Sequence, residues 1–92
     1  MLVESENIYL NAYPNPFTDE TVIEMKSAIR QEARLEIFST QGNIVATLYN
    51  GMTEEGKSYK LDFKAGDLQS GIYYFRLTTA TENKVGKLVL IR

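Results

Sequence analysis

Apolar and polar residues alternate with a period of two along most of this chain, and this pattern constrains the fold more than any other feature. The stretch 58–63 (SYKLDF) is the clearest case, because every second residue from Tyr59 to Phe63 is apolar. The stretch 33–39 (ARLEIFS) repeats the pattern, and 71–79 (GIYYFRLTT) adds aromatic and β-branched residues. Successive side chains of a strand point to opposite faces, so this periodicity predicts β-strands with one buried face.

Further strands are expected at 8–13, 20–25, 44–49 and 84–92. From Leu88 onward the last of these is apolar almost throughout, which is typical of a strand covered on both faces. The stretch 27–34 (SAIRQEAR) is the single helix candidate, but it is shorter than the roughly 12 residues that an isolated helix needs. We interpret it as a loop with at most one helical turn.

Turn residues separate the expected strands. Gly42 in 40–43 (TQGN) indicates a hairpin, because glycine adopts the positive φ angles that tight turns require. Asn50 and Gly51, with Gly56 following after two glutamates, are expected to turn the chain after the strand at 44–49. The stretch 65–71 (AGDLQSG) predicts a longer connection, and 79–83 (TATEN) predicts the tip of a last hairpin.

Seven short antiparallel strands in a chain of 92 residues are typical of an all-β, immunoglobulin-like β-sandwich. The chain has neither cysteine nor tryptophan, so the Cys–Trp–Cys signature of antibody domains is missing and the core must close by packing alone. A closed barrel is the competing arrangement. We expect one domain over residues 8–92, preceded by a polar, linker-like segment at 1–7.

The composition excludes most catalytic and metal-binding chemistry. Without cysteine or histidine, the chain lacks thiolate nucleophiles, disulfides and the commonest general base. The adjacent acidic pairs at 19–20 and 54–55 fit no calcium-loop pattern and are interpreted as solvated turn charges. The sequence therefore predicts neither an enzyme nor a cofactor site.

The charge pattern bears on partners. The net charge is -2 and the basic residues form no stripe, so no nucleic-acid partner is expected. No apolar run approaches the roughly 18 residues of a membrane-spanning helix, so no membrane insertion is expected, and the domain is expected to be a monomer.

Tyr9 and Tyr13 on the outer face of the first strand, with Tyr74 pointing outward, leave open a sugar-stacking surface, although tyrosines commonly have structural roles in β-sandwiches.

Four segments occur in an order that resembles a known family. They are YPNPF (13–17), LEIFSTQGNIV (35–45), LQSGIYYFRLTT (68–79) and KVGKLVLIR (84–92). Together they resemble the type A C-terminal sorting domain of the type IX secretion system of Bacteroidetes, over about residues 8–92. The residues that match the motifs of that family are Pro14, Asn15, Pro16, Gly42, Leu68, Gly71, Tyr73 and Lys87.

The resemblance implies a targeting role. Such a domain is the last part of a larger exported precursor, whose cargo first reaches the periplasm and then crosses the outer membrane through the type IX machinery. A sortase-like protease usually removes the domain, here in or upstream of residues 1–7, and the cargo ends on the cell surface or in the medium. Among the motif residues, Lys87 is the one that we assign to recognition, because no apolar face needs a lysine there.

A second function class stays open beside this one. A structural or carbohydrate-binding module of the immunoglobulin or fibronectin type has a similar fold, and fold alone does not separate the two. Position in the precursor does, because a sorting signal must lie at the extreme C-terminus. The last expected strand reaches the last residue, which favours the sorting signal. The chain ends in Leu-Ile-Arg, less basic than many members of the family.

Overall fold

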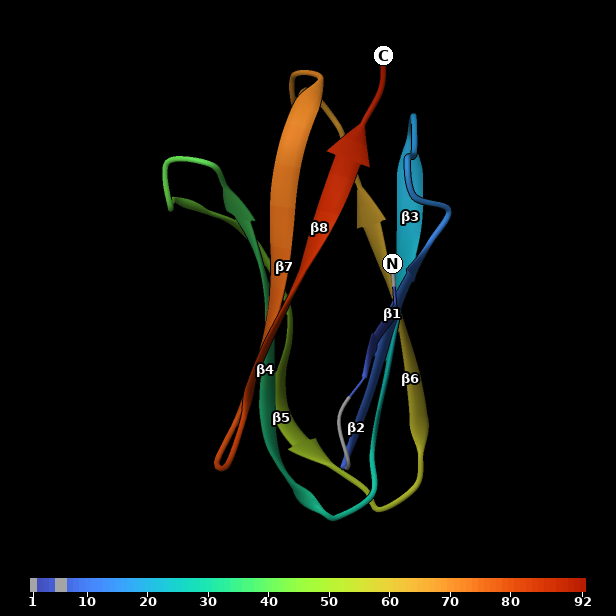
Figure 1. The fold of residues 1–92 in the computed structure, drawn as a ribbon, viewed down its shortest axis with the longest axis vertical. Coiled ribbons are helices and arrows are strands. Elements are labelled where there is room, and N and C mark those ends of the chain that lie inside the picture. The colour runs from blue at the N-terminus through green and yellow to red at the C-terminus, as the bar shows by residue number, and fades with distance from the viewer. Residues whose placement is uncertain (1, 5–6) are drawn as a thin grey trace.

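Two antiparallel sheets face each other in the computed structural model (Figure 1), which describes residues 2–4 and 7–92. Sheet A has the strand order β1-β2-β3-β6, and sheet B has the order β5-β4-β7-β8. The strands are β1 (Leu2–Glu4), β2 (Ile8–Tyr13), β3 (Glu20–Ser27), β4 (Gln31–Ser39), β5 (Ile44–Thr53), β6 (Ser58–Lys64), β7 (Gly71–Thr79) and β8 (Asn83–Leu90). The expected immunoglobulin-like sandwich is confirmed, and the sheets do not close into a barrel.

Strands β2 to β8 are the seven that the sequence predicts, and β1 was not expected. Leu2, Val3 and Glu4 pair with β2 in antiparallel register. Part of the segment interpreted as a linker thus forms the edge of sheet A, beside the first long strand. Residues 1, 5 and 6 of that segment lie outside the described residues.

The expected turn at Asn50 and Gly51 is wrong. Both residues lie inside β5, opposite Arg34 and Ala33 of β4. The partner strand decides this, because β4 already begins at Gln31 and offers pairing positions as far as Thr53. The reversal falls instead at residues 54–57, where Gly56 has a φ angle of +70°.

The last strand is covered on one face, not on two as the sequence suggested. Leu88 and Leu90 of β8 are buried, whereas Val85 and Ile91 are 51% and 52% exposed.

The short stretch between β3 and β4 contains no helix, as expected. The Ser27 hydroxyl donates to the Ile29 carbonyl over 2.6 Å and closes that turn.

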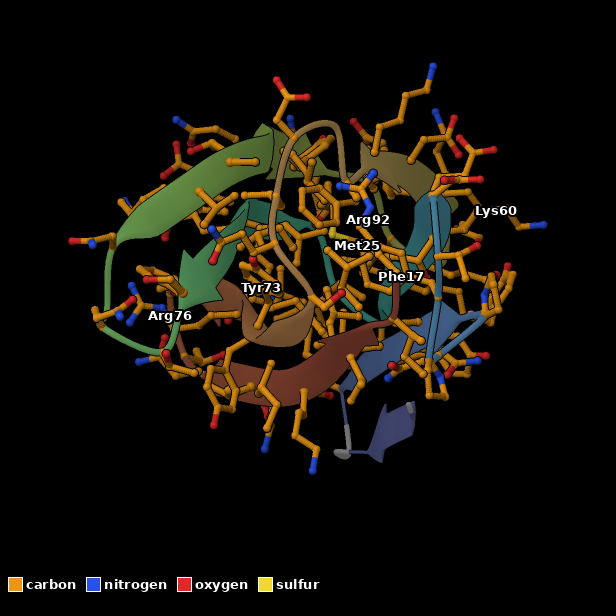
Figure 2. All side chains as sticks on the ribbon, turned by 90° about the horizontal axis from the view of Figure 1, so that it is seen from above. Phe17, Met25, Lys60, Tyr73, Arg76 and Arg92 are labelled. Atoms are coloured by element: carbon orange, nitrogen blue, oxygen red, sulfur yellow. The ribbon has the colours of Figure 1, made fainter. Side chains whose placement is uncertain are left out.

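The core fills the space between the sheets with buried apolar residues of β2, β3, β4, β6, β7 and β8, whereas the apolar residues of β5 that pack against it are only partly buried. Both sheets contribute fully buried side chains, namely Leu10, Ile23, Leu35, Phe75 and Leu88. Figure 2 shows Phe17, Met25 and Tyr73 pointing between the sheets and Lys60 pointing away. The rings of Tyr49 and Tyr59 meet edge to face at 5.2 Å and join β5 to β6 at one end.

Candidate functional site

Strand β8 is the outer strand of sheet B, and its outer edge is covered by residues 14–17, which follow β2. Asn15 donates from its side-chain nitrogen to the Lys87 carbonyl over 2.7 Å and accepts from the Val89 N–H over 3.0 Å. Phe17 continues this pairing, because its N–H donates to the Val89 carbonyl over 2.9 Å and its carbonyl accepts from the Ile91 N–H over 2.8 Å. Four hydrogen bonds therefore close the edge of the last strand, which would otherwise be open to pairing with another chain.

The two prolines shape the segment on either side of Asn15. Both peptide bonds that precede them are cis. The Pro14 carbonyl accepts a hydrogen bond from the Thr21 hydroxyl over 2.7 Å, which ties the segment to the start of β3. Phe17 is only 2% exposed, so its side chain anchors the segment in the core. Proline fixes φ and has no N–H to donate to β8. The hydrogen bonds to the edge of β8 therefore come from the Asn15 side chain and the Phe17 backbone.

A second group of motif residues forms the junction between β6 and β7. The Tyr73 hydroxyl donates to the Gln69 carbonyl over 2.7 Å, and the Tyr73 ring is buried. Leu68 packs against the core from the same loop. Gly71 begins β7 with a φ angle of +150°, a conformation that favours glycine. These three residues fix the loop 65–70 to the strand that pairs with β8.

The end of the chain contacts this loop. The Arg92 guanidinium donates to the Leu68 carbonyl over 2.6 Å, and the Arg92 N–H donates to the Ser70 hydroxyl over 3.0 Å. The sequence analysis did not single out Arg92, because a terminal arginine carries no signal of which carbonyl it will meet. The contact joins the loop between Leu68 and Gly71 to the residues that follow β8.

The β2–β3 connection, the start of β7 and the end of β8 thus lie at the end of the sandwich where the C-terminus lies (Figure 1). Asn15 reaches β8 at Lys87 through the backbone, and Leu68 meets Arg92 through its carbonyl. Gly42 lies at the tip of the β4–β5 hairpin with a φ angle of +88°, as the hairpin prediction requires. The Gly42 N–H donates to the Ser39 carbonyl over 3.0 Å, a backbone hydrogen bond within the hairpin itself.

The sequence analysis also missed Gly86, which lies inside β8 and faces the core. Gly86 stands opposite Phe75 of β7 in the register. A Cβ atom at Gly86 would lie 2.1 Å from Cζ of the Phe75 ring, so the fully buried ring occupies the space of the missing side chain. A period-two pattern could have indicated this inward position, but not the ring that covers it.

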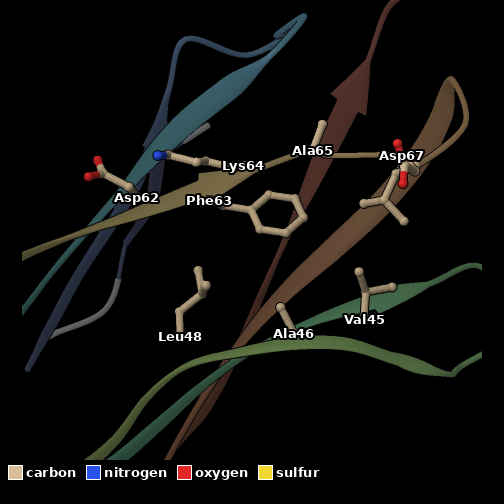
Figure 3. A pocket seen from close by; sticks show the side chains of 9 residues that line it. Val45, Ala46, Leu48, Asp62, Phe63, Lys64, Ala65 and Asp67 are labelled. Carbon is tan, nitrogen blue, oxygen red and sulfur yellow. The ribbon is translucent and has the colours of Figure 1, made fainter.

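An open apolar groove lies between β5 and β6 (Figure 3) and has a volume of about 590 Å³. Its lining is mostly apolar, from Val45, Ala46, Leu48, Phe63, Ala65 and Leu68. The charged groups at this groove are Asp62, Lys64 and Asp67. The lining holds no hydroxyl or thiol nucleophile.

The outer face of sheet A carries the two tyrosines considered for sugar stacking. Tyr9 and Tyr13 are 38% and 37% exposed. The polar groups beside them bond to one another, since Ser58 and Tyr13 donate to the two oxygens of Glu24 over 2.7 and 3.0 Å. The Ser58 hydrogen bond, followed by that of Tyr13, lowers the pKa of Glu24, and the carboxylate raises the pKa of Tyr13. The Tyr13 and Ser58 hydroxyls are thus both engaged with the Glu24 carboxylate.

Two features are absent from the described residues, 2–4 and 7–92. No cluster of three or more carboxylate, imidazole or thiol side chains in this part of the chain could hold a metal ion. No helix there is long and apolar enough to cross a membrane.

The fold and the closed β8 edge place the chain in the class of immunoglobulin-like β-sandwich domains. Within that class, the chain belongs to the family of secretion system C-terminal sorting domains, whose profile matches residues 11–91. This confirms the resemblance drawn from the four motif segments. A search of curated proteins finds no match.

A solved structure shares the fold. Dimeric latent PorU from Porphyromonas gingivalis matches with a TM-score of 0.71 and 13% sequence identity. The match covers 91% of this chain and 9% of the PorU chain, so the domain spans a small part of that protein.

Family membership sets the role of the domain. It is a sorting signal of the type IX secretion system, attached to a cargo protein and exported with it across the outer membrane. The precursor reaches the cell surface or the medium. Its family is one of targeting signals and not of catalysts.

Proposed function

We propose that residues 8–92 act as a monomeric signal that the type IX machinery reads in the periplasm on a folded domain, and that a sortase-like protease then removes the domain from its cargo. The observation that carries this proposal is the joining of the motif segments around the last strand. Asn15 holds the backbone at Lys87, and Arg92 holds the loop at Leu68. Segments far apart in sequence therefore present one surface only when the domain is folded.

The motif residues divide into two groups by exposure. Tyr73 is buried, and Leu68 packs against the core, so a receptor has little access to them. Lys87 is exposed on the outward side of β8, and Pro14, Pro16, Gly42 and Gly71 are exposed too. Among these exposed motif residues, Lys87 has the charged side chain and is assigned to direct contact. Pro14 and Pro16 act through the placement of Asn15.

A reporter fusion tests the sorting role. Residues 1–92 are fused to the C-terminus of a periplasmic reporter in a bacterium with a working type IX system. We expect the reporter on the cell surface or in the medium. A deletion from Lys84 onward should retain it in the periplasm, since the variant loses both the last strand and its edge contacts. Intact wild-type fusion that stays in the periplasm would contradict the proposal.

The same fusion tests the cleavage. We expect the protease to cut in or upstream of residues 1–7, because β2 and the core begin at Ile8. The pairing of β1 with β2 makes residues 2–4 less accessible than an open linker, which favours a cut outside that strand. Mass spectrometry of the released domain gives the bond, and a cut inside β2 or later would contradict this assignment.

A further inference from the structure

The two sides of the sandwich are closed to different extents. On the side of β8, Phe17 bonds the edge of the strand through its backbone and places its buried ring in the core. On the opposite side, β6 is the outer strand of sheet A and β5 is the outer strand of sheet B. Within residues 2–4 and 7–92, no further strand pairs with the outer edge of either one.

The core is least covered on this open side. The apolar residues that pack against the core but are only partly buried all come from β5, β6 and the loop 65–70, namely Val45, Ala46, Leu48, Tyr49, Tyr59, Leu61 and Leu68. Val45, Ala46 and Leu48 line one wall of the groove of about 590 Å³, and Phe63 lines the other (Figure 3). The groove therefore has room for apolar side chains that the described part of the chain does not supply.

The outer edge of β6 is regular, whereas β5 is interrupted. Strand β6 pairs with β3 at seven consecutive positions without a register shift. Strand β5 has two irregularities against β4, where Val45 and Leu48 have no directly opposed partner. Bulges of this kind bend and twist a strand and protect its edge from further pairing. The edge that can accept another strand is therefore that of β6.

The backbone of β6 presents hydrogen-bonding groups to its outer edge. The Ala65 N–H donates to the Asp19 carbonyl over 2.8 Å, which extends the ladder between β6 and β3 by one pair. In an antiparallel ladder, every second residue bonds the partner strand and the residues between point their N–H and C=O groups away from it. Counted back from Ala65, the backbone groups that point to the outer edge belong to Ser58, Lys60, Asp62 and Lys64. Such a row of donors and acceptors matches an extended peptide backbone.

The side chains of β6 specify the charge of a strand that would pair with it. Lys60 and Lys64 stand opposite glutamates of β3, whereas Asp62 stands opposite Val22. Asp62 is exposed and forms no ion pair with another residue of the described ranges. Opposite charges at opposed positions of paired strands stabilise the pair, so a complementary strand has a basic residue opposite Asp62. The residues on either side of that basic residue then point into the groove.

We propose that the outer edge of β6 binds an extended segment of a partner protein, which adds to sheet A as a further strand. The segment has a basic residue opposite Asp62 and apolar neighbours that fill the groove between β5 and β6. Phe17 closes the edge of β8 in the same way, by backbone pairing and an inserted ring. A second copy of β6 does not supply the apolar side chains, because its Phe63 is buried in its own core. The inference rests on the proposed function, since the partner belongs to the export machinery.

The reporter fusion with substitutions at Asp62 tests the strand addition. Asp62→Pro removes an outward N–H and leaves the ladder to β3 intact, because proline is tolerated where the N–H of an edge strand faces solvent. Its export should fall about threefold to tenfold, the effect of one lost hydrogen bond. Asp62→Ala is the matched control that keeps the N–H, and its export should fall by no more than about twofold. Asp62→Lys repels the basic residue of the partner and should lower export at least about threefold.

A substitution that fills the groove tests the apolar part of the proposal. Ala46→Phe places a ring where the side chains of the partner would lie, so export should fall about tenfold. The added ring buries apolar surface, so the thermal midpoint should equal or exceed that of the wild type. Thermal unfolding of each purified chain verifies that every variant is folded at the temperature of the export assay.

Hydrogen exchange of the purified wild-type chain, followed by NMR, tests the open edge itself. The outward N–H groups of Lys60, Asp62 and Lys64 should exchange faster than those of Leu61 and Phe63, which bond β3. Equal protection of the two sets would show that the edge of β6 is closed and would overturn the proposal.

The export results separate this proposal from the sorting role. Wild-type export together with equal export of Asp62→Pro and Ala46→Phe would overturn the strand addition and leave the sorting role standing. Retention of the wild type in the periplasm would overturn both. A dimer in light scattering that Asp62→Pro abolishes would replace the partner protein by a second copy of this chain.

Discussion

Asn15 should stabilise the last strand through both ends of its amide. Its nitrogen donates to the Lys87 carbonyl over 2.7 Å, and its oxygen accepts from the Val89 N–H over 3.0 Å. A hydrogen bond contributes about 0.5–1.5 kcal/mol net, and water can reach this edge and replace part of each bond. We expect Asn15→Ala to lower the free energy of unfolding by about 1–2 kcal/mol. For a domain of this size that corresponds to a fall in the thermal midpoint of about 5–15 °C.

Asn15→Asp makes the test sharper, because it changes one atom of the amide. The introduced carboxylate still accepts from the Val89 N–H, but its second oxygen faces the Lys87 carbonyl oxygen at about the present 2.7 Å separation. Two acceptors repel, so at neutral pH this variant should unfold more easily than Asn15→Ala.

The repulsion also sets the direction of the pH dependence. It favours the protonated form in the folded state, so the pKa of the introduced carboxyl rises on folding above its unfolded value of about 3.9. The stabilising O–H donor is then present below that unfolded pKa and is lost as pH rises through the folded pKa. Relative to the wild type at each pH, Asn15→Asp should recover stability on acidification.

Thermal unfolding followed by circular dichroism, between pH 3 and pH 8, measures these differences. Asn50→Ala, at an exposed asparagine within β5, is the control and should change the midpoint little. If Asn15→Asp is as stable as the wild type at neutral pH, the amide nitrogen does not bond the strand edge and the reasoning fails.

Two other positions give predictions of the same kind. Gly86→Ala should lower the free energy of unfolding by about 1–3 kcal/mol in urea titration, because the new Cβ would lie 2.1 Å from the Phe75 ring and the buried ring has no room to move. Gly51→Ala is its control, with a nearest atom at 4.0 Å, and equal effects at the two glycines would contradict the packing argument. Tyr73→Phe should cost about 1 kcal/mol through the lost hydrogen bond to the Gln69 carbonyl, and an unchanged urea midpoint would show that water replaces this bond.

The local sequence pattern was sufficient to predict the strands and to identify the family. The alternation in 58–63 and 33–39 predicted β6 and β4, because the side-chain period of a strand is a property of the local backbone. Gly42 predicted its hairpin for the same reason, since the positive φ angle belongs to one residue. Local pattern gave a wrong prediction where the pairing of two strands sets the end of a strand. Asn50 and Gly51 were predicted to form a turn, but they lie in β5 and pair with residues of β4.

What the sequence by itself determined is therefore the set of strands, most of their limits and the order of the motifs. Tertiary structure decided how the motifs meet. Asn15 and Lys87 stand 72 residues apart, and nothing in either segment indicates that an amide will bond the backbone of the last strand. That contact exists because the two sheets pack face to face and bring the end of β2 to the free edge of β8. The Pro-Asn-Pro motif is a turn in sequence and becomes the cover of the C-terminal strand only in the folded sandwich.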